Sequence, residues 1–567
     1  MHDRRRGHPD RPLPPAGRPG RSEGGPGRHR PLRGDRVSTG VSDVLVVGGG
    51  HNGLIAALRL ARAGRRVTVV EQGAEPGGCV WTDRHPSGVL VERGAFEHGG
   101  VYPMAVELGL DDPALGDRAV RYREHPVLAG VAFGDGQRRV FYSDVAATVA
   151  ALGADGPGYR HLVELADALF GMLDTFGTAP TLTQVAAALA ALPGGDELFR
   201  TLLQPAETVL DAAVSDPHTR AAMALQAAHA QVPAWAPGSG LFALLLPASH
   251  RSPAVRPAGG SRALVDALVA ALERAGATVR TGAAVVAMGS TESPAAARGR
   301  VELAGGAVLT ADAVVSAIGL PRTAALLTDP APAMRATARG LHSGHFNIAE
   351  LTVTVVHDRA HALPLQDPDA VWYTLRAPAD VRTGFAEVLA GRLPSSPWSM
   401  VGQVGQPDGI TGGAVWMSSI VPLHRADGEW TPEREREAAD RVIDQVGSVL
   451  GVDLRDGLVD VVASGPLTWA ARIGGDGNPN HLDNTLDQLL GWRPPGHADM
   501  RTELPWLFLA GAGQHPGGGL SGASGSAAAA AVLGTRRRDR LDRRAVREVH
   551  ALWSGLTAYR AMRRGPR

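Results

Sequence analysis

The stretch "DVLVVGGGHNGLIAALRLARAGRRVTVVEQ", residues 43–72, constrains the fold more than any other part of the chain. An apolar run leads into three glycines, a helix-like run rich in small residues follows, and a second apolar run ends at an acid. This order predicts a strand, a tight turn, a helix and a second strand, which together form one βαβ unit. We therefore expect an α/β fold with a parallel sheet that binds a dinucleotide.

The turn has the spacing G-x-G-x-x-G, formed by Gly48, Gly50 and Gly53, with His51 and Asn52 inside it. The first glycine permits the tight turn, the second lets the backbone approach a pyrophosphate, and the third lets helix and strand pack closely. The helix then directs its free N–H groups at the phosphates. Glu71 ends the second run and is expected to accept hydrogen bonds from ribose hydroxyls, which disfavours a 2′-phosphate.

Three further features favour FAD over NAD as the dinucleotide. Gly77 and Gly78 follow closely after Glu71, so a second bare backbone segment is able to run along the ligand. The late segment "GAGQHPGGGLSG", residues 511–522, predicts another glycine-rich turn before a helix, suited to the flavin end. A second strand–G-x-G-x-x-G–helix unit for NAD(P)H is not found in the sequence.

The nucleotide-type segments are separated by long insertions of different character, which predicts two interleaved domains. We expect a Rossmann-type FAD-binding domain from residues 42–104, 256–334 and 471–535. A substrate-binding α+β domain is expected from residues 105–255, which are mostly helical in pattern, and from residues 335–470. The termini are predicted to be a disordered basic Pro/Gly/Arg tail over residues 1–41 and a basic helix over residues 536–567.

Several segments together resemble one family of flavoproteins. "VVGGGHNGLIAA" (46–57), "EPGG" (75–78), "RPAGGSRALVDAL" (256–268), "GGDGNPNHLDNTLDQLLGWRP" (474–494) and "LFLAGAGQHPGGGLSGASG" (507–525) are similar to the phytoene desaturase-like FAD-dependent oxidoreductases. The nearest branch holds the carotenoid ketolase-like enzymes and pyridine nucleotide-disulfide oxidoreductase domain-containing protein 2. The resemblance implies a two-domain FAD oxidoreductase that acts on apolar substrates.

The resemblance also implies which residues hold the cofactor. The ADP half of FAD would contact the residues Gly48, Gly50, Gly53, Glu71, Gly77 and Gly78. Val285 lies in the strand whose backbone commonly meets the adenine in this family. The flavin end would lie beside Gly511, Gly513, Gly517, Gly518 and Gly519. One departure is Cys79, which stands where many relatives of the wider family have an arginine, so that phosphate contact is in doubt.

Composition excludes several classes of function. The chain has no lysine, so neither a lysine Schiff base nor a phosphate-loop lysine is available. Its single cysteine cannot form an internal disulfide, and no apolar run approaches the roughly 20 residues that span a bilayer. The net charge of zero divides into about +6 over residues 1–36, +8 over residues 536–567 and −14 between them. Because the basic residues lie in the tails, we expect no nucleic-acid partner.

Other residues have both a functional and a structural interpretation. His515 in the late glycine turn is the candidate catalytic residue, by hydrogen bonding to flavin or substrate, or it caps the turn, and Gln514 is a weaker candidate. His481 and Asp483 form an acid–base pair or an ordinary polar loop. Cys79 is a packing residue or a redox site, and His98 lines the cavity or packs in a loop. The pairs His342/His345 and His357/His361 lack a metal-site context, so no metal is predicted.

The sequence therefore predicts an FAD-dependent oxidoreductase that transfers hydride from an apolar, carotenoid- or isoprenoid-like substrate to flavin N5, of desaturase or ketolase type. Two alternatives stay open: an amine or amino-acid oxidase on the same fold, and a non-catalytic FAD-bound regulatory protein. The electron acceptor and the oligomeric state are not indicated. A cytoplasmic location is expected, and the basic segment 539–562 is compatible with peripheral contact to an anionic membrane or with packing on protein.

Overall fold

A computed structural model of the protein describes residues 42–291 and 298–534. The predicted basic tail 1–41 and the predicted basic helix 536–567 lie outside these described residues, so both remain predictions. Within the described ranges, no helix combines the length and the apolar character that crossing a membrane requires.

The first of two large sheets is built around the predicted βαβ unit. Strand β1 lies at its centre, with β2 and β12 as parallel neighbours; β9 continues the parallel array beside β2, and β18 pairs in parallel with β12. Beyond β12, the strands β11 and β10 are antiparallel. The bounds are β1 Ser42–Val47, β2 Val67–Val70, β9 Thr278–Arg280, β10 Val285–Ser290, β11 Gly299–Leu303, β12 Val308–Ser316 and β18 Leu507–Leu509.

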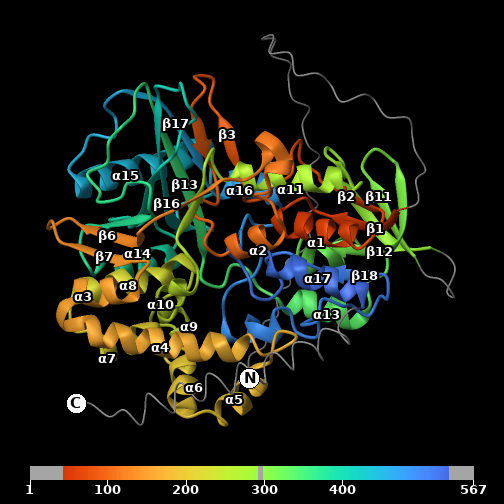
Figure 1. Ribbon diagram of the computed structural model, residues 1–567, viewed down its shortest axis with the longest axis horizontal. Coiled ribbons are helices and arrows are strands. Elements are labelled where there is room, and N and C mark those ends of the chain that lie inside the picture. Colours follow the sequence, from red (N-terminus) through yellow and green to blue (C-terminus); the bar gives the residue numbers. More distant parts are fainter. Residues whose placement is uncertain (1–41, 292–297, 535–567) are drawn as a thin grey trace, which may run out of the picture. The chain divides into compact units, whose positions relative to one another are not determined.

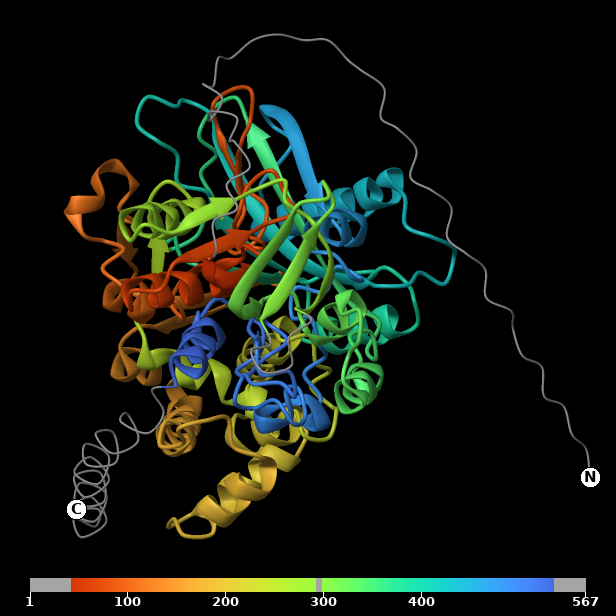
Figure 2. The same cartoon turned by 90° about the vertical axis from the view of Figure 1, so that its right-hand side faces the viewer.

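Three helices cover this sheet around the glycine turn. Helix α1 (His51–Arg62) is buried along most of its length because α11 (Arg262–Arg274) and α17 (Ala523–Leu533) both pack on it. Figure 1 shows α1 in red beside α17 in blue, although the two helices are far apart in the sequence, and Figure 2 shows the same neighbours from a second side. The small residues of α17, a run of five alanines from 527 to 531, permit this close approach.

The second large sheet has the strand order β17-β13-β16-β15-β14-β6-β7. Every neighbouring pair is antiparallel except β14 and β6, which are parallel. The bounds are β17 Leu458–Ser464, β13 Ile348–His357, β16 Gly413–Pro422, β15 Ser399–Gln403, β14 Trp372–Leu375, β6 Val127–Phe133 and β7 Arg138–Tyr142. The strands β6 and β7 come from the segment with the mostly helical pattern, where "VLAGVAF" is a continuous apolar run buried on both faces.

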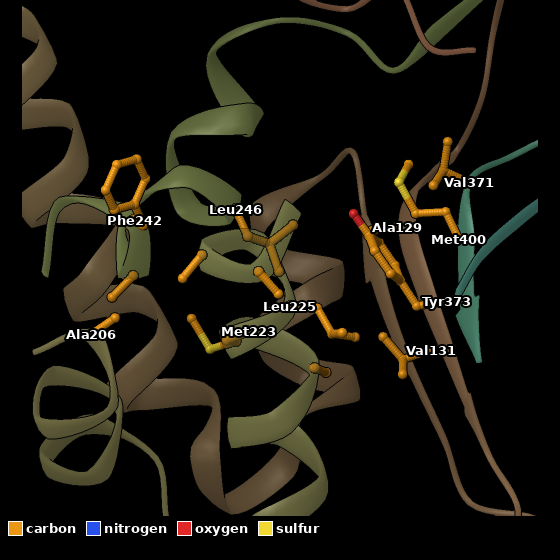
Figure 3. Close-up of a cluster of buried hydrophobic side chains, with 14 of the residues drawn as sticks. Ala129, Val131, Ala206, Met223, Leu225, Phe242, Leu246, Val371, Tyr373 and Met400 are labelled. Atoms are coloured by element: carbon orange, nitrogen blue, oxygen red, sulfur yellow. The ribbon is translucent and has the colours of Figure 1, made fainter. Parts of the chain in front are cut away.

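Side chains of this second sheet alternate between two cores, as the period of a strand requires. Along β16, Val415 and Met417 pack with helix α15 (Pro432–Leu450), whereas Ala414 and Trp416 belong to the core shared with the helices of residues 145–248. Figure 3 shows part of that helical core, in which Met223, Leu225 and Leu246 face Tyr373, Val131 and Met400 of the strands.

The remaining elements are two small strand pairs and the other α-helices. The strands β3 (Thr82–Arg84) and β4 (Leu90–Glu92) form one small antiparallel pair, and β5 (Tyr122–Glu124) and β8 (Val255–Pro257) form another. The remaining α-helices are α2 Tyr102–Glu107, α3 Val145–Ala151, α4 Gly156–Leu173, α5 Leu182–Leu189, α6 Gly195–Leu203, α7 Ala206–Ala213, α8 Pro217–His229, α9 Gly240–Ala243, α10 Leu245–Ala248, α12 Leu320–Leu326, α13 Pro332–Gly340, α14 Asp380–Leu389 and α16 Pro466–Ile473.

The predicted fold class is confirmed: an α/β nucleotide-binding sheet is interleaved with a second sheet and its helices. Three separate segments of the chain build the first sheet: β1 and β2, then β9 to β12, and finally β18. The individual domain boundaries stay predictions.

Candidate functional site

One cavity of about 410 Å³ joins the two glycine-rich segments that the sequence singled out. It is lined by the turn before α1 and by the loop before α17. The predicted site residues that line it are Gly48, Gly50, His51, Asn52, Gly53, Glu71, Gly78, Val285, Gly511 and Gly519. The structure therefore brings together in one cavity residues that are more than 400 positions apart.

The glycine turn leaves room where a ligand would pass. Gly48 has φ +100°, which a residue with a side chain rarely adopts, and a Cβ on Gly53 would overlap the carbonyl oxygen of Gly48. At Gly50, by contrast, an added Cβ would meet no protein atom within 4 Å. Gly50 is the N-cap of α1 and no side chain caps that helix, so the N–H groups of its first turn face the open space.

The second glycine pair runs beside the first turn. Gly50 and Gly77 form an isolated parallel bridge, and the Gly77 N–H donates to the Gly49 carbonyl at 2.8 Å. Gly78 lies in the cavity wall, whereas Gly77 does not line it. The pair thus adds a second bare backbone segment along the same face of the cavity.

The Glu71 carboxylate is hydrogen-bonded to the glycine turn. It directly follows β2, which ends at Val70, and its Oε2 accepts from the Gly49 N–H at 2.7 Å. Its Oε1 accepts from the Gly73 N–H at 2.8 Å. These two bonds orient the carboxylate in the cavity wall, as a ribose ligand requires. Beyond it, Val285 at the start of β10 lines the cavity together with Ala283 and Leu326, an apolar setting suited to an adenine.

The loop before α17 is tied to the turn before α1. The Gly511 N–H donates to Ser524 Oγ at 3.1 Å, and the Gly525 N–H donates to Asn52 Oδ1 at 3.3 Å. Asn52 therefore connects the first turn of α17 to the glycine turn. Four residues of this loop line the cavity: Gly511, Ala512, Gly519 and Leu520. The predicted residues Gly513, Gly517 and Gly518 do not line it.

The structure does not bring His515 to the cavity surface. Its N–H donates to the Arg493 carbonyl at 3.1 Å, and its Nδ1 is buried with no hydrogen-bond partner among the described residues. Burial lowers the pKa of His515 to about 4, with the positive charge of Arg493 as a smaller cause. The neighbouring Gln514 is fully buried. A catalytic role for His515 remains a prediction.

Two other histidines do line the cavity, His51 and His481. Burial lowers the pKa of each to about 4, so both rings are neutral at physiological pH. The proposed pair of His481 with Asp483 is not formed, because the Asp483 carboxylate instead contacts His342 Nδ1 at 2.9 Å and accepts from the His345 N–H at 2.7 Å. His481 Nδ1 is left buried without a partner among the described residues.

The remaining histidines that the sequence singled out lie away from the cavity wall. His98 is fully buried, and its Nδ1 lies 3.3 Å from the Tyr122 hydroxyl. The rings of His357 and His361 stack with centroids 4.5 Å apart, and His357 Nε2 bonds to the Leu454 carbonyl. Cys79 does line the cavity, and burial raises the pKa of its thiol to about 12.

Sequence reasoning missed most of the wall on the side of the second sheet. Met400 on β15 and Trp416 on β16 line the cavity, and Phe96 stacks on Trp416 with ring centroids 4.4 Å apart and an interplanar angle of 3°. Two carboxylates, Glu97 and Glu350, lie in the same wall. Nothing local in the sequence marks the sheet residues, since they meet the glycine turn only through the tertiary fold.

Residues 53–533 match the family model described as flavin containing amine oxidoreductase. The chain belongs to this family. The protein is therefore an FAD-dependent oxidoreductase, as the glycine turn and the late glycine loop predicted.

Several relatives are similar over different lengths. Phytoene desaturase (lycopene-forming) of Paracoccus sp. (strain N81106 / MBIC 01143) is 25% identical over 522 residues, 88% of this chain and 98% of the relative. Coproporphyrinogen III oxidase of Propionibacterium freudenreichii subsp. freudenreichii is 27% identical over 505 residues, which cover 82% of this chain and 88% of the relative. Pyridine nucleotide-disulfide oxidoreductase domain-containing protein 2 of Mus musculus is 35% identical, but over only 119 residues, 20% of each chain.

The fold itself is also found in solved structures. Cyclohexylamine oxidase from Brevibacterium oxydans IH-35A superposes with a TM-score of 0.54 at 16% identity, covering 87% of this chain and 99% of that one. At this identity the similarity concerns the fold alone.

The residues present fit FAD. The open space at Gly50, the uncapped N-terminus of α1 and the oriented Glu71 carboxylate suit the adenosine diphosphate half. The backbone of residues 511–512 and 519–520 forms a further stretch of the wall, beside which the flavin ring would lie. FAD when bound would supply the hydride acceptor, and the chain would hold it, exclude water and position a substrate.

Proposed function

We propose that this enzyme dehydrogenates an apolar, isoprenoid-like substrate, as a desaturase, with the flavin of FAD as hydride acceptor. The observation that carries the proposal is the large apolar part of the cavity wall, which Phe96, Met400 and Trp416 form. Large apolar side chains at this place favour binding of a hydrocarbon chain through the area that it removes from water. The similarity to a phytoene desaturase along 88% of the chain supports the same substrate class.

The apolar wall is held rigidly. The Phe96 ring stacks on Trp416. The guanidinium carbon of Arg256 also lies over the Phe96 ring, 3.6 Å from its centroid. Arg256 in turn donates to the Asp369 carbonyl at 2.6 Å. A fixed wall orients a flexible chain, so that one C–H bond is presented to the acceptor and water is kept out.

Desaturation also requires a proton acceptor, because one hydrogen leaves as hydride and the hydrogen on the adjacent carbon leaves as a proton. Glu97 lies in the cavity wall next to Phe96, and burial raises its pKa to about 7, partly offset by the charge of Arg256. A carboxylate with this pKa accepts a proton readily near neutral pH. We assign the proton-accepting role to Glu97, which lines the cavity.

A second candidate is an amine oxidase, favoured by a specific observation. Glu350 on β13 also lines the cavity, and its Oε1 accepts a hydrogen bond from Ser418 Oγ at 2.8 Å. Two carboxylates, Glu97 and Glu350, suit a substrate that bears a cationic amine better than they suit a pure hydrocarbon. Under this candidate Glu350 would bind the amine, and its replacement would abolish substrate binding.

The two candidates are separated by anaerobic mixing of the FAD-loaded enzyme with single substrate classes, followed through the visible absorption of oxidised flavin. We expect bleaching by an acyclic isoprenoid in detergent and none by primary amines such as putrescine or cyclohexylamine. Bleaching by amines alone, abolished in Glu350→Gln, would replace the proposal with the second candidate. Rapid bleaching by NADPH alone would show that the flavin is reduced by a nicotinamide, and would overturn the direction of hydride transfer.

A further inference from the structure

Arg472, near the end of α16, places a guanidinium in the cavity wall beside the second glycine pair. Its Nε donates to the Gly78 carbonyl at 3.2 Å. Its guanidinium carbon lies 4.4 Å from the centroid of the Trp81 ring, a cation–π distance. These contacts fix the plane of the group against the backbone segment that follows the Gly77–Gly78 pair.

One end of this guanidinium has no protein partner. Arg472 Nη2 is buried and makes no hydrogen bond among the described residues, and within them the side chain forms no ion pair. The described residues therefore leave this positive charge without a counter-ion, and a charge in a partly buried wall is stabilised by an anion bound beside it. Burial lowers the pKa of Arg472, while Glu71, Asp83 and Glu75 raise it, and a guanidinium stays protonated at neutral pH.

The other arginine of the cavity wall is already engaged. Arg322 donates from Nη2 to Gln72 Oε1 at 2.6 Å and from Nη1 to the Ile473 carbonyl at 3.0 Å. Cys79 follows the second glycine pair directly and lines the cavity, and neither form of a thiol is a cation. The side chain directly after the second glycine pair therefore offers no positive charge to a diphosphate.

We infer that Arg472 binds the diphosphate of FAD through the part of its guanidinium that lines the cavity. A positive charge beside the second glycine pair would thus come from α16, 394 positions further along the chain than Gly78. The Gly78 carbonyl and the Trp81 ring hold the guanidinium in the orientation that this contact requires. The inference concerns the cofactor and not the substrate, so it goes beyond the proposed function and does not depend on it.

The test measures binding to the flavin-free protein rather than turnover. Apoprotein is titrated calorimetrically with FAD, with ADP, which carries a diphosphate without a flavin, and with adenosine, which carries no phosphate. We expect Arg472→Met to weaken FAD and ADP binding by about 10- to 100-fold, the range for loss of one charge-assisted hydrogen bond. Adenosine binding should be unchanged.

The matched control is Arg93→Met. Arg93 also lies over the Trp81 ring, at 4.2 Å, but it does not line the cavity and it pairs with Asp83 at 3.1 Å. We expect this variant to keep the wild-type ratio of ADP to adenosine affinity. If Arg472→Met does not fold, Arg472→Lys, which keeps the charge without the planar fork, serves instead and should lower that ratio by a smaller factor. An unchanged ratio in the folded Arg472 variant, or an equal loss for ADP and adenosine, would overturn the inference.

Discussion

Arg493 donates a hydrogen bond of 2.8 Å from its Nη2 to the main-chain carbonyl of Asn480, a residue of the cavity wall. The same fully buried guanidinium also donates to the carbonyls of Leu482, Asp483, Gln488 and Ala512. Burial lowers the pKa of Arg493 to about 10, so it stays charged at neutral pH. One side chain thus joins the loop of residues 480–488 to the loop at the flavin end.

We predict that Arg493→Met destabilises the protein by about 3 kcal/mol or more, because several buried carbonyls lose their donor at once. Urea unfolding of the apoprotein measures this, and the purified variant should also carry less flavin. Arg441→Gln removes an arginine from an exposed pair with Glu437 on one helix and should change the free energy of unfolding by less than about 0.5 kcal/mol. Equal unfolding free energies of Arg493→Met and wild type would show that the two loops keep their conformation without the Arg493 hydrogen bonds.

The glycine turn yields a pair of opposite predictions. Gly50 has φ −67° and ψ 165°, which alanine adopts freely, and an added Cβ would enter the open space beside Gly78. Gly50→Ala should therefore leave the apoprotein's unfolding free energy within about 1 kcal/mol of wild type, yet weaken FAD binding at least about tenfold by crowding the diphosphate. Full FAD affinity in this variant would contradict the placement of the diphosphate.

Gly53→Ala should instead lower the stability of the apoprotein. Its Cβ would overlap the carbonyl oxygen of Gly48, so the turn and α1 cannot pack as they do. We expect the apoprotein itself to lose about 1–3 kcal/mol of stability, measured by urea unfolding without FAD. Comparing the two variants separates the glycine that makes room for the ligand from the glycine that makes room for the fold.

The sequence predicted those features of the site that depend only on neighbouring residues. The roles of Gly48, Gly50 and Gly53 depend on backbone geometry within a few residues, so their spacing alone predicted the turn. The wall residues Trp416 and Glu350 reach the cavity only because β13 and β16 pair in the second sheet, and no short motif encodes that. Arg472 was missed for the same reason, because its partner Gly78 lies 394 positions earlier in the chain.

Strands β6 and β7 illustrate a second limit. The apolar run "VLAGVAF" within a mostly helical segment has no alternation, because both faces of β6 are buried, and a run of this kind cannot be told from a buried helix by its period. His515 shows a different limit, because a local motif placed it near the flavin end. It is not among the residues that line the cavity, its N–H bonds to the Arg493 carbonyl, and its catalytic role stays a prediction.

The pH dependence of flavin reduction tests the role of Glu97. Its pKa of about 7 means that the carboxylate form, which accepts a proton, increases as pH rises through about 7. The rate of anaerobic flavin reduction should therefore rise about tenfold per unit below that pH and level off above it. Glu97→Gln should be slower by about 100-fold and lose this dependence. Glu350→Gln, the matched change in the same wall, should keep the wild-type profile; a profile kept in Glu97→Gln would assign the proton to another group.

Buried neutral histidines should make the apoprotein sensitive to acid, and His98 offers the cleanest test. Burial lowers its pKa to about 3, with the charge of Arg256 as a smaller cause, against about 6.5 in the unfolded chain. Below pH 6.5 the unfolded state binds a proton that the folded state does not, so stability is lost as pH falls from 6.5 toward about 3. His98 contributes about 1.4 kcal/mol per pH unit to this slope.

We predict that His98→Gln reduces the slope of unfolding free energy against pH by about one proton between pH 6 and pH 4, measured by urea unfolding at several pH values. Burial raises the pKa of Glu92 and of Glu97 to about 7, so these two groups oppose the effect between pH 4.5 and 7, but they act equally in variant and wild type. The difference between the two proteins therefore isolates His98. An identical slope in both would mean that His98 takes up its proton in the folded state.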